Sequence, residues 1–155
     1  MTAQLTIRPA GLTQTPLLVA LHAESFGNAG WSADQIRGSL ALATSKARVA
    51  CEGERAVGFI LCQTVPQQTE ILTLCVCPDR RRRHIGDALL RHVAEEMRAA
   101  GGGKILLEVA ADNLPARRLY EQFGFTSDGT RANYYKRGAV TVDAVMYGYE
   151  VGARG

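Results

Sequence analysis

The spacing of apolar and polar residues predicts a chain that begins with a strand and two helices. Leu5 and Ile7 alternate with polar neighbours, as in a short strand with one buried face. The segment 15–26 has a proline in its first turn and leucines on one side, so we expect a helix there. Ser32 is a suitable N-cap for a second helix over 33–43.

The pattern then becomes typical of strands. Segments 48–52 and 56–64 predict two strands joined by a turn at Gly53. The run EILTLCVC over 70–77 is apolar on both faces, so we expect a central strand rather than an edge strand. Pro78 would end it, because proline cannot donate to a strand ladder.

The second half of the chain alternates between the two periods. Segment 85–100 carries apolar residues at helical spacing, and Gly101 is a natural stop. The elements expected after it are a strand over 104–110, a short helix over 115–123, and a hairpin of strands over 126–135 and 140–149 around Gly138. This order predicts one domain over 1–155 with a mixed α/β (α+β) fold, in which helices flank a twisted, largely antiparallel sheet.

Composition changes this picture little. The chain has 155 residues, 46% of them hydrophobic and 21% charged, which suits one globular domain. No apolar run is long enough to span a bilayer and no signal-peptide pattern is present, so we expect a cytoplasmic protein without a membrane partner. The four cysteines include no CxxC pair, so we expect no metal site and reduced, buried thiols instead.

The distribution of charge along the chain says more about function than the composition does. The net charge is +3, but four arginines are contiguous at 80–83 and His84 follows. They lie just before the helix expected at 85, and a helix N-terminus has unpaired N–H groups and a partial positive charge, which favours phosphate. Gly86 would let a ligand approach the backbone. The arginines alone leave a solvated loop and a nucleic-acid patch open as alternatives.

The run VCPDRRRRHIGDALL over 76–90 resembles the acyl-CoA pyrophosphate loop of the GNAT superfamily of N-acetyltransferases. That loop shows Gln or Arg, two residues of any type, Gly, any residue, then Gly or Ala, and 81–86 follow this pattern except at His84. A histidine could adopt the positive φ that suits glycine only at some cost. The segments 107–113 and 116–125 are similar to the next two family elements. RANYY over 131–135 is similar to a segment of the bacterial ribosomal-protein-alanine N-acetyltransferases.

The resemblance implies that acetyl-CoA binds as co-substrate, without a metal, where the sheet splays between two central strands. The residues implied in its binding are Leu74, Cys75, Val76, Arg81, Arg82, Arg83, His84, Ile85, Gly86, Asp87 and Asn113. Main-chain groups of 74–76 would bond the pantetheine arm as an added strand does, and an N–H near Val76 would polarise the thioester carbonyl. Asn113 would bond the pantetheine or cap the helix behind it.

Two residues are expected to move protons. Glu108 lies in the apolar run ILLEVA, where an unpaired carboxylate is energetically unfavourable. We expect it to be the general base. A structural salt bridge with an arginine is the alternative. The family match implies that Tyr120 is the acid that protonates the leaving thiolate. The alternative is that Tyr120 only packs against its neighbours. No histidine is placed by sequence to activate a cysteine, so we expect direct transfer.

The acceptor side is the least specified. The residues expected to line a peptide groove are Trp31, Arg131, Asn133, Tyr134 and Tyr135. For the two tyrosines, plain strand pairing with one ring inward and one outward is the alternative. The resemblance implies acetylation of a protein N-terminus, with a small-subunit ribosomal protein as the candidate partner and no direct nucleic-acid contact. The competing functions are acetylation of a small-molecule amine and, in a non-catalytic module, binding of acyl-CoA or RNA.

Overall fold

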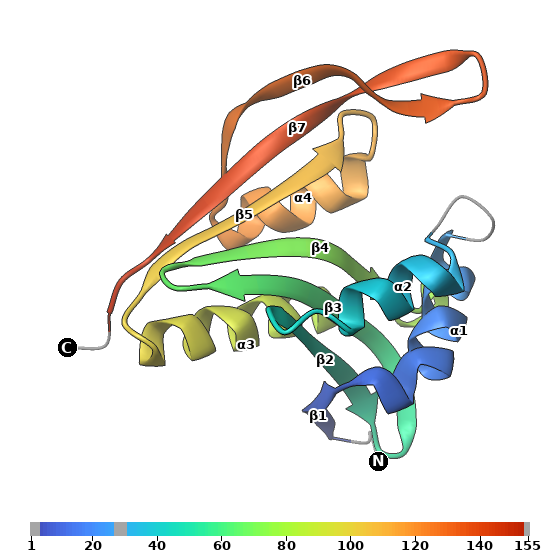
Figure 1. Cartoon of the computed structure of the whole chain (residues 1–155), viewed down its shortest axis with the longest axis vertical. Coiled ribbons are helices and arrows are strands. Elements are labelled where there is room, and N and C mark those ends of the chain that lie inside the picture. The colour runs from blue at the N-terminus through green and yellow to red at the C-terminus, as the bar shows by residue number, and fades with distance from the viewer. Residues whose placement is uncertain (1–3, 27–30, 154–155) are drawn as a thin grey trace. The chain divides into compact units, whose positions relative to one another are not determined.

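The computed structural model describes residues 4–26 and 31–153 (Figure 1). Its strands and helices, in chain order, are β1 (Leu5–Ala10), α1 (Thr15–Phe26), α2 (Ala33–Leu40), β2 (Ser45–Glu52), β3 (Arg55–Val65), β4 (Gln68–Val76), α3 (Ile85–Ala99), β5 (Gly103–Ala110), α4 (Leu114–Phe123), β6 (Thr126–Arg137) and β7 (Val140–Val151). Short 3₁₀ turns at Leu12–Gln14 and Pro78–Arg80 complete the list. The predicted order of elements is confirmed.

Seven strands hydrogen-bond in the order β1-β2-β3-β4-β5-β7-β6. The pairs β1/β2, β2/β3, β5/β7 and β6/β7 are antiparallel, and β4/β5 is parallel. The prediction of a mixed, largely antiparallel sheet flanked by helices is therefore confirmed, and β4 is central as expected. The parallel register joins Gln68–Glu70 to Lys104–Leu106, whereas β4 continues to Val76 and β5 to Ala110.

The chain forms two compact units. The first comprises residues 1–65 and 72–93, and the second comprises 66–71 and 94–155. The expectation of one domain over 1–155 stays a prediction. In the first unit, α1 and α2 contribute Leu18, Leu21 and Ile36 to a core that also contains Phe59 and Leu61 of β3.

The core of the second unit is aromatic. Phe123 and Phe125, at the end of α4 and just beyond it, contact the ring of Tyr149 at centroid distances of 5.1 and 5.2 Å. Between them Gly124 has φ 123°, a backbone conformation that suits glycine at the end of a helix. Tyr147 of β7 is 1% exposed and packs under the same helix.

The expected end of the second helix is wrong. Helix α2 stops at Leu40 with Ala41 as its C-cap, whereas the apolar pattern predicted helix to residue 43. The chain turns there because the Ser45 N–H donates to the Leu42 carbonyl at 3.0 Å, which starts the approach to β2. Ala43, the apolar residue that extended the pattern, is exposed and does not face the core.

Candidate active site

We call residues 81–87 the arginine loop. Arg82 and His84 have φ values of 65° and 62°, so the histidine adopts the positive φ that was expected to be costly for it. A left-handed residue next to a right-handed one builds a concavity of N–H groups that binds anions, and His84 followed by the helical residue Ile85 is such a pair. The His84 carbonyl accepts the Ala88 N–H at 3.0 Å, so α3 begins directly behind the loop. This backbone suits an anion.

The arginines of the stretch 80–83 have different surroundings. Arg80 donates through Nε to Glu52 Oε1 at 2.6 Å, so it belongs to a structural ion pair. Arg81 donates through Nε to the Val76 carbonyl at 3.3 Å and through Nη2 to the Ser25 carbonyl at 3.5 Å. Arg82 and Arg83 are exposed. Arg80 and Arg81 therefore hold the loop in place, and the next two present charge to solvent.

The end of β4 lies against β3. A Cβ on Gly58 would lie 2.6 Å from the Cys75 carbonyl oxygen, so only glycine allows this approach. The Val76 carbonyl accepts the Ser25 hydroxyl at 3.2 Å as well as Arg81. This carbonyl already has partners, and a role for the main chain of Leu74–Val76 in binding pantetheine stays a prediction.

The thiols near this strand are poor nucleophiles. Burial raises the pKa of Cys75 to about 12. Burial, and next a hydrogen bond from the thiol to Glu24, raise the pKa of Cys77 to about 11. Because the thiolate is the reactive form, both side chains are inert near neutral pH. An acetyl-cysteine at either position is therefore disfavoured, and direct transfer stays a prediction.

Trp31 belongs to the first unit, where a buried histidine holds its backbone. The Trp31 N–H donates to His22 Nδ1 at 3.3 Å. The other ring nitrogen, Nε2, then carries the hydrogen and faces the Thr73 hydroxyl at 3.3 Å. His22 is 2% exposed, and burial lowers its pKa, so the ring stays neutral. Trp31 is thus tied to α1 and through it to β4.

Glu108 and Arg131, both in the second unit, form an ion pair. Arg131 Nε lies 2.9 Å from Glu108 Oε1, and the side chains are 53% and 26% exposed. Strand β7 separates their strands: Glu108 is opposite Met146, and Arg131 is opposite Ala144. Opposed residues, and residues two apart on a strand, share a face, so the long arginine side chain reaches the carboxylate across the small Ala144. A salt bridge with an arginine, which was the alternative to a catalytic role for Glu108, is therefore present.

The two tyrosines after Arg131 lie on a β-bulge. The register of β6 against β7 shifts between Arg131 and Tyr135. Asn133 has φ 55°; its N–H donates to Asp143 Oδ1 at 2.9 Å, and its side-chain oxygen accepts the Thr141 hydroxyl at 2.8 Å. The Tyr134 and Tyr135 rings are 5.1 Å apart at 90°, so they touch instead of alternating as in a regular strand. Arg131 lies 5.6 Å from the centre of the Tyr134 ring.

Tyr120 faces the other side of this sheet. It is 7% exposed, and its ring centroid lies 5.6 Å from that of Phe125 and 6.3 Å from that of Tyr147. Because Tyr147 follows Met146 on β7, its side chain points away from the face that carries Glu108. Within the second unit, the predicted base and the predicted acid therefore project from opposite faces.

Asn113 caps α4. Its side-chain oxygen accepts the Ala116 N–H at 3.3 Å, so the capping alternative is realised. The amide NH₂ of the same side chain is a donor that this contact does not use. Binding of pantetheine by Asn113 stays a prediction.

Sequence reasoning missed a buried phenol beneath α4. The Tyr147 hydroxyl donates to Glu121 Oε2 at 2.6 Å and accepts from Arg117 Nε at 3.0 Å. Burial, and next the contact with Glu121, raise the pKa of Tyr147. The i, i+4 spacing of Arg117 and Glu121 was the available signal, but the phenol between them comes from a distant strand. The cluster fixes the helix that carries Tyr120.

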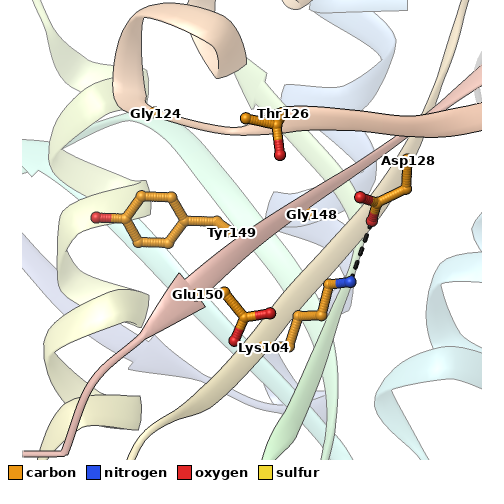
Figure 2. A pocket seen from close by; sticks show the side chains of 7 residues that line it. All are labelled: Lys104, Gly124, Thr126, Asp128, Gly148, Tyr149 and Glu150. Atoms are coloured by element: carbon orange, nitrogen blue, oxygen red, sulfur yellow. Dashed lines mark ion pairs between the residues drawn. The ribbon is translucent and has the colours of Figure 1, made fainter.

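A pocket of about 300 Å³ lies elsewhere in the second unit. Its lining residues are Lys104, Gly124, Thr126, Asp128, Gly148, Tyr149 and Glu150. Figure 2 shows the Lys104 ammonium directed at the Asp128 carboxylate, 3.2 Å away. None of these residues was predicted for the site.

The part of the chain that the structure describes offers neither a metal-binding cluster nor a membrane-spanning helix. Residues 4–26 and 31–153 contain no group of three or more His, Cys, Asp or Glu side chains able to hold a metal ion. Over the same ranges, no helix has the length and apolar character needed to cross a membrane.

Comparison with known proteins gave consistent matches. The model of the "Acetyltransferase (GNAT) family" matches residues 18–125. A ribosomal protein bS18-alanine N-acetyltransferase of Escherichia coli strain K12 is 30% identical over 138 residues, 88% of this chain and 93% of that relative. The crystal structure of the E. coli ribosomal-protein-S18-alanine N-acetyltransferase has a TM-score of 0.87 and 25% identity, covering 98% of this chain and 97% of that one. Arabidopsis thaliana NAA60 in complex with acetyl-CoA has a similar fold, with a TM-score of 0.81 and 20% identity over 96% of this chain and 99% of that one.

Proposed function

Since the chain belongs to the GNAT family of acetyltransferases, we propose that it moves the acetyl group of acetyl-CoA directly to the N-terminal α-amine of a protein. Membership of the family and the names of its relatives confirm the prediction of an N-acetyltransferase. The acceptor and the role of each residue are our proposal. The observation that carries it is the Glu108 carboxylate, which an arginine holds beside a hairpin that presents Tyr134.

The arginine loop would hold the diphosphate of acetyl-CoA. Support comes from the left-handed Arg82 and His84, the start of α3 behind them, and the exposed guanidinium groups of Arg82 and Arg83. Ile85, Gly86 and Asp87 form the first turn of that helix. The main chain of Leu74–Val76 and the Asn113 amide would bond the pantetheine arm. Acetyl-CoA supplies the activated thioester, and the chain itself binds, orients and moves protons.

Glu108 would take the proton of the attacking amine, directly or through water. An α-amine has a pKa near 8, so roughly a tenth of it is already neutral at pH 7, whereas a lysine side chain near 10.4 is almost entirely charged. One carboxylate is therefore a sufficient base for an N-terminus and a weaker one for lysine. Tyr120, on the opposite face, would donate its proton to the leaving thiolate.

The acceptor would be a protein N-terminus, with a ribosomal protein as the candidate. The E. coli relative of that name supports this, as does the hairpin segment with Arg131, Asn133, Tyr134 and Tyr135. Trp31 is the candidate from the first unit. A ribosomal-protein acceptor would place the reaction in the cytoplasm.

The test is an acceptor panel with the full chain and acetyl-CoA. It contains a peptide with a free N-terminal alanine and an internal lysine, the same peptide with a blocked N-terminus, and a polyamine. We expect acetylation at the α-amine, mapped by mass spectrometry, and negligible turnover of the blocked peptide. Glu108→Gln should lower kcat by about 100-fold or more and leave the affinity for acetyl-CoA unchanged.

Three results would contradict the proposal. Preferred turnover of the polyamine would favour a small-molecule acceptor. Salt-sensitive RNA binding without acetyl-CoA binding would identify a binding module. Full activity of Glu108→Gln would remove the base assignment.

A further inference from the structure

The Glu108–Arg131 pair places a negative and a positive group side by side on one face of the second unit. The two polar atoms are 2.9 Å apart, and both side chains are partly exposed. A guanidinium has five N–H donors, so its contact with one carboxylate leaves donors for a second acceptor. The Glu108 carboxylate has a second oxygen beside the one that Arg131 contacts. Each partner can therefore bind a ligand while the ion pair persists.

Arg131 has a second contact besides the one with Glu108. The Tyr134 ring lies 5.6 Å from its guanidinium, within range of a cation–π interaction. The bulge that carries this ring is fixed at Asn133 by hydrogen bonds with Asp143 and Thr141. An exposed arginine normally loses much side-chain entropy when it binds a ligand. These contacts reduce that loss, as expected of a group with a positioning role.

This arrangement matches the head group of a peptide. In an N-terminal residue the amine nitrogen and the carbonyl oxygen are separated by three bonds, about 3 Å through space with standard backbone dimensions. The nitrogen is a cation or a donor, and the oxygen is an acceptor. A carboxylate and a guanidinium at the separation seen here would face these two atoms at once. A simple alkyl amine offers only the first.

We propose that Glu108 and Arg131 together recognise the amino-acyl head of the acceptor: the carboxylate binds the amine, and the guanidinium binds the first carbonyl oxygen. Arg131 is then a specificity residue that distinguishes peptide N-termini from simple amines. This inference rests on the proposed function, because it places the acceptor amine at Glu108. It adds a requirement for a carbonyl that a single base does not impose.

The test uses two acceptors that differ in one group. One is an alanine-led peptide, and the other is the same peptide with its first amide replaced by an E-alkene, which keeps the shape and removes the carbonyl oxygen. The measured quantity is the ratio of kcat/KM for the amide to that for the alkene. Because the same two acceptors are used with every variant, the difference between their amine pKa values cancels.

We expect Arg131→Met to lower this ratio by about tenfold or more, the effect of one charge-assisted hydrogen bond. Arg131→Lys should keep part of the ratio, because it retains the charge without the planar fork. Arg118→Met, at an exposed arginine on α4, is the matched control and should leave the ratio unchanged. An unchanged melting temperature and KM for acetyl-CoA would show that each variant is folded.

The possible outcomes separate this inference from the proposed function. If Arg131→Met slows both acceptors equally, Arg131 only supports Glu108 and the inference is wrong, while the base assignment stands. If the wild-type ratio is near one, the carbonyl is not recognised and the inference is also wrong. Full activity of Glu108→Gln with both acceptors would instead overturn the proposed function.

Discussion

The arginine loop and the Glu108–Arg131 pair both prepare the protein for a charged partner, but they are built in opposite ways. The loop is continuous in sequence, and its shape comes from the left-handed backbone at Arg82 and His84. The ion pair joins residues from two strands with a third strand between them. Binding of acetyl-CoA by the loop should therefore depend on which residues can adopt its backbone conformation. Turnover of the acceptor at the ion pair should depend on which functional groups its side chains carry.

The strongest test of this contrast within the loop is His84→Val. A β-branched residue is strained in the left-handed region, at a cost on the order of 1–3 kcal/mol. We expect the KM for acetyl-CoA to rise about tenfold, measured at saturating peptide. His84→Gly, which accepts this φ without strain, should bind acetyl-CoA at least as well as the wild type. Equal losses in both variants would mean that the imidazole matters rather than the backbone.

In the hairpin, an intermediate effect is expected from Asn133→Ala. Alanine removes the oxygen that accepts the Thr141 hydroxyl and tolerates φ 55° less well than asparagine. Loosening the bulge should lower kcat/KM for the peptide by about three- to tenfold, with the KM for acetyl-CoA unchanged. Thr141→Val removes only the hydrogen bond and should have the smaller effect. A change in acetyl-CoA affinity instead would contradict a role confined to the acceptor.

The smallest effect is expected from the exposed charges of the loop. Arg82→Gln and Arg83→Gln should each weaken acetyl-CoA binding by about two- to fivefold at low salt, because exposed charges contribute little. The difference from the wild type should vanish near 0.5 M salt, where screening is strong. Isothermal titration at two salt concentrations measures it, with Arg118→Gln as the control. A large, salt-independent loss would show direct coordination by that side chain.

Much of the fold could be predicted because the deciding patterns are local. The apolar runs of β3 and β4, the period near 3.6 in α3, and the cap at Asn113 each lie within a few residues. The end of α2 could not be predicted, because Ala43 extends the apolar pattern while the turn to Ser45 stops the helix. An apolar residue in a turn looks the same in sequence as one on a buried face.

The candidate site was predictable in its parts and not in its connections. Glu108 was conspicuous as a carboxylate in an apolar strand, but nothing local says which arginine it meets. Arg131 is 23 positions away, and the contact depends on the register of β7 and on the small Ala144. The bulge at Asn133 likewise depends on Asp143, a residue of the opposite strand. Strand register, which sequence patterns fix weakly, decides both.

The buried cysteines also affect how this protein can be studied. The chain has four, at positions 51, 62, 75 and 77, and none is more than 8% exposed. A thiol-reactive dye added to the folded enzyme should therefore report the free coenzyme released at each turnover, with little background from the protein itself. The kinetic comparisons above can be followed in real time, in native sequence, without first removing any sulfur.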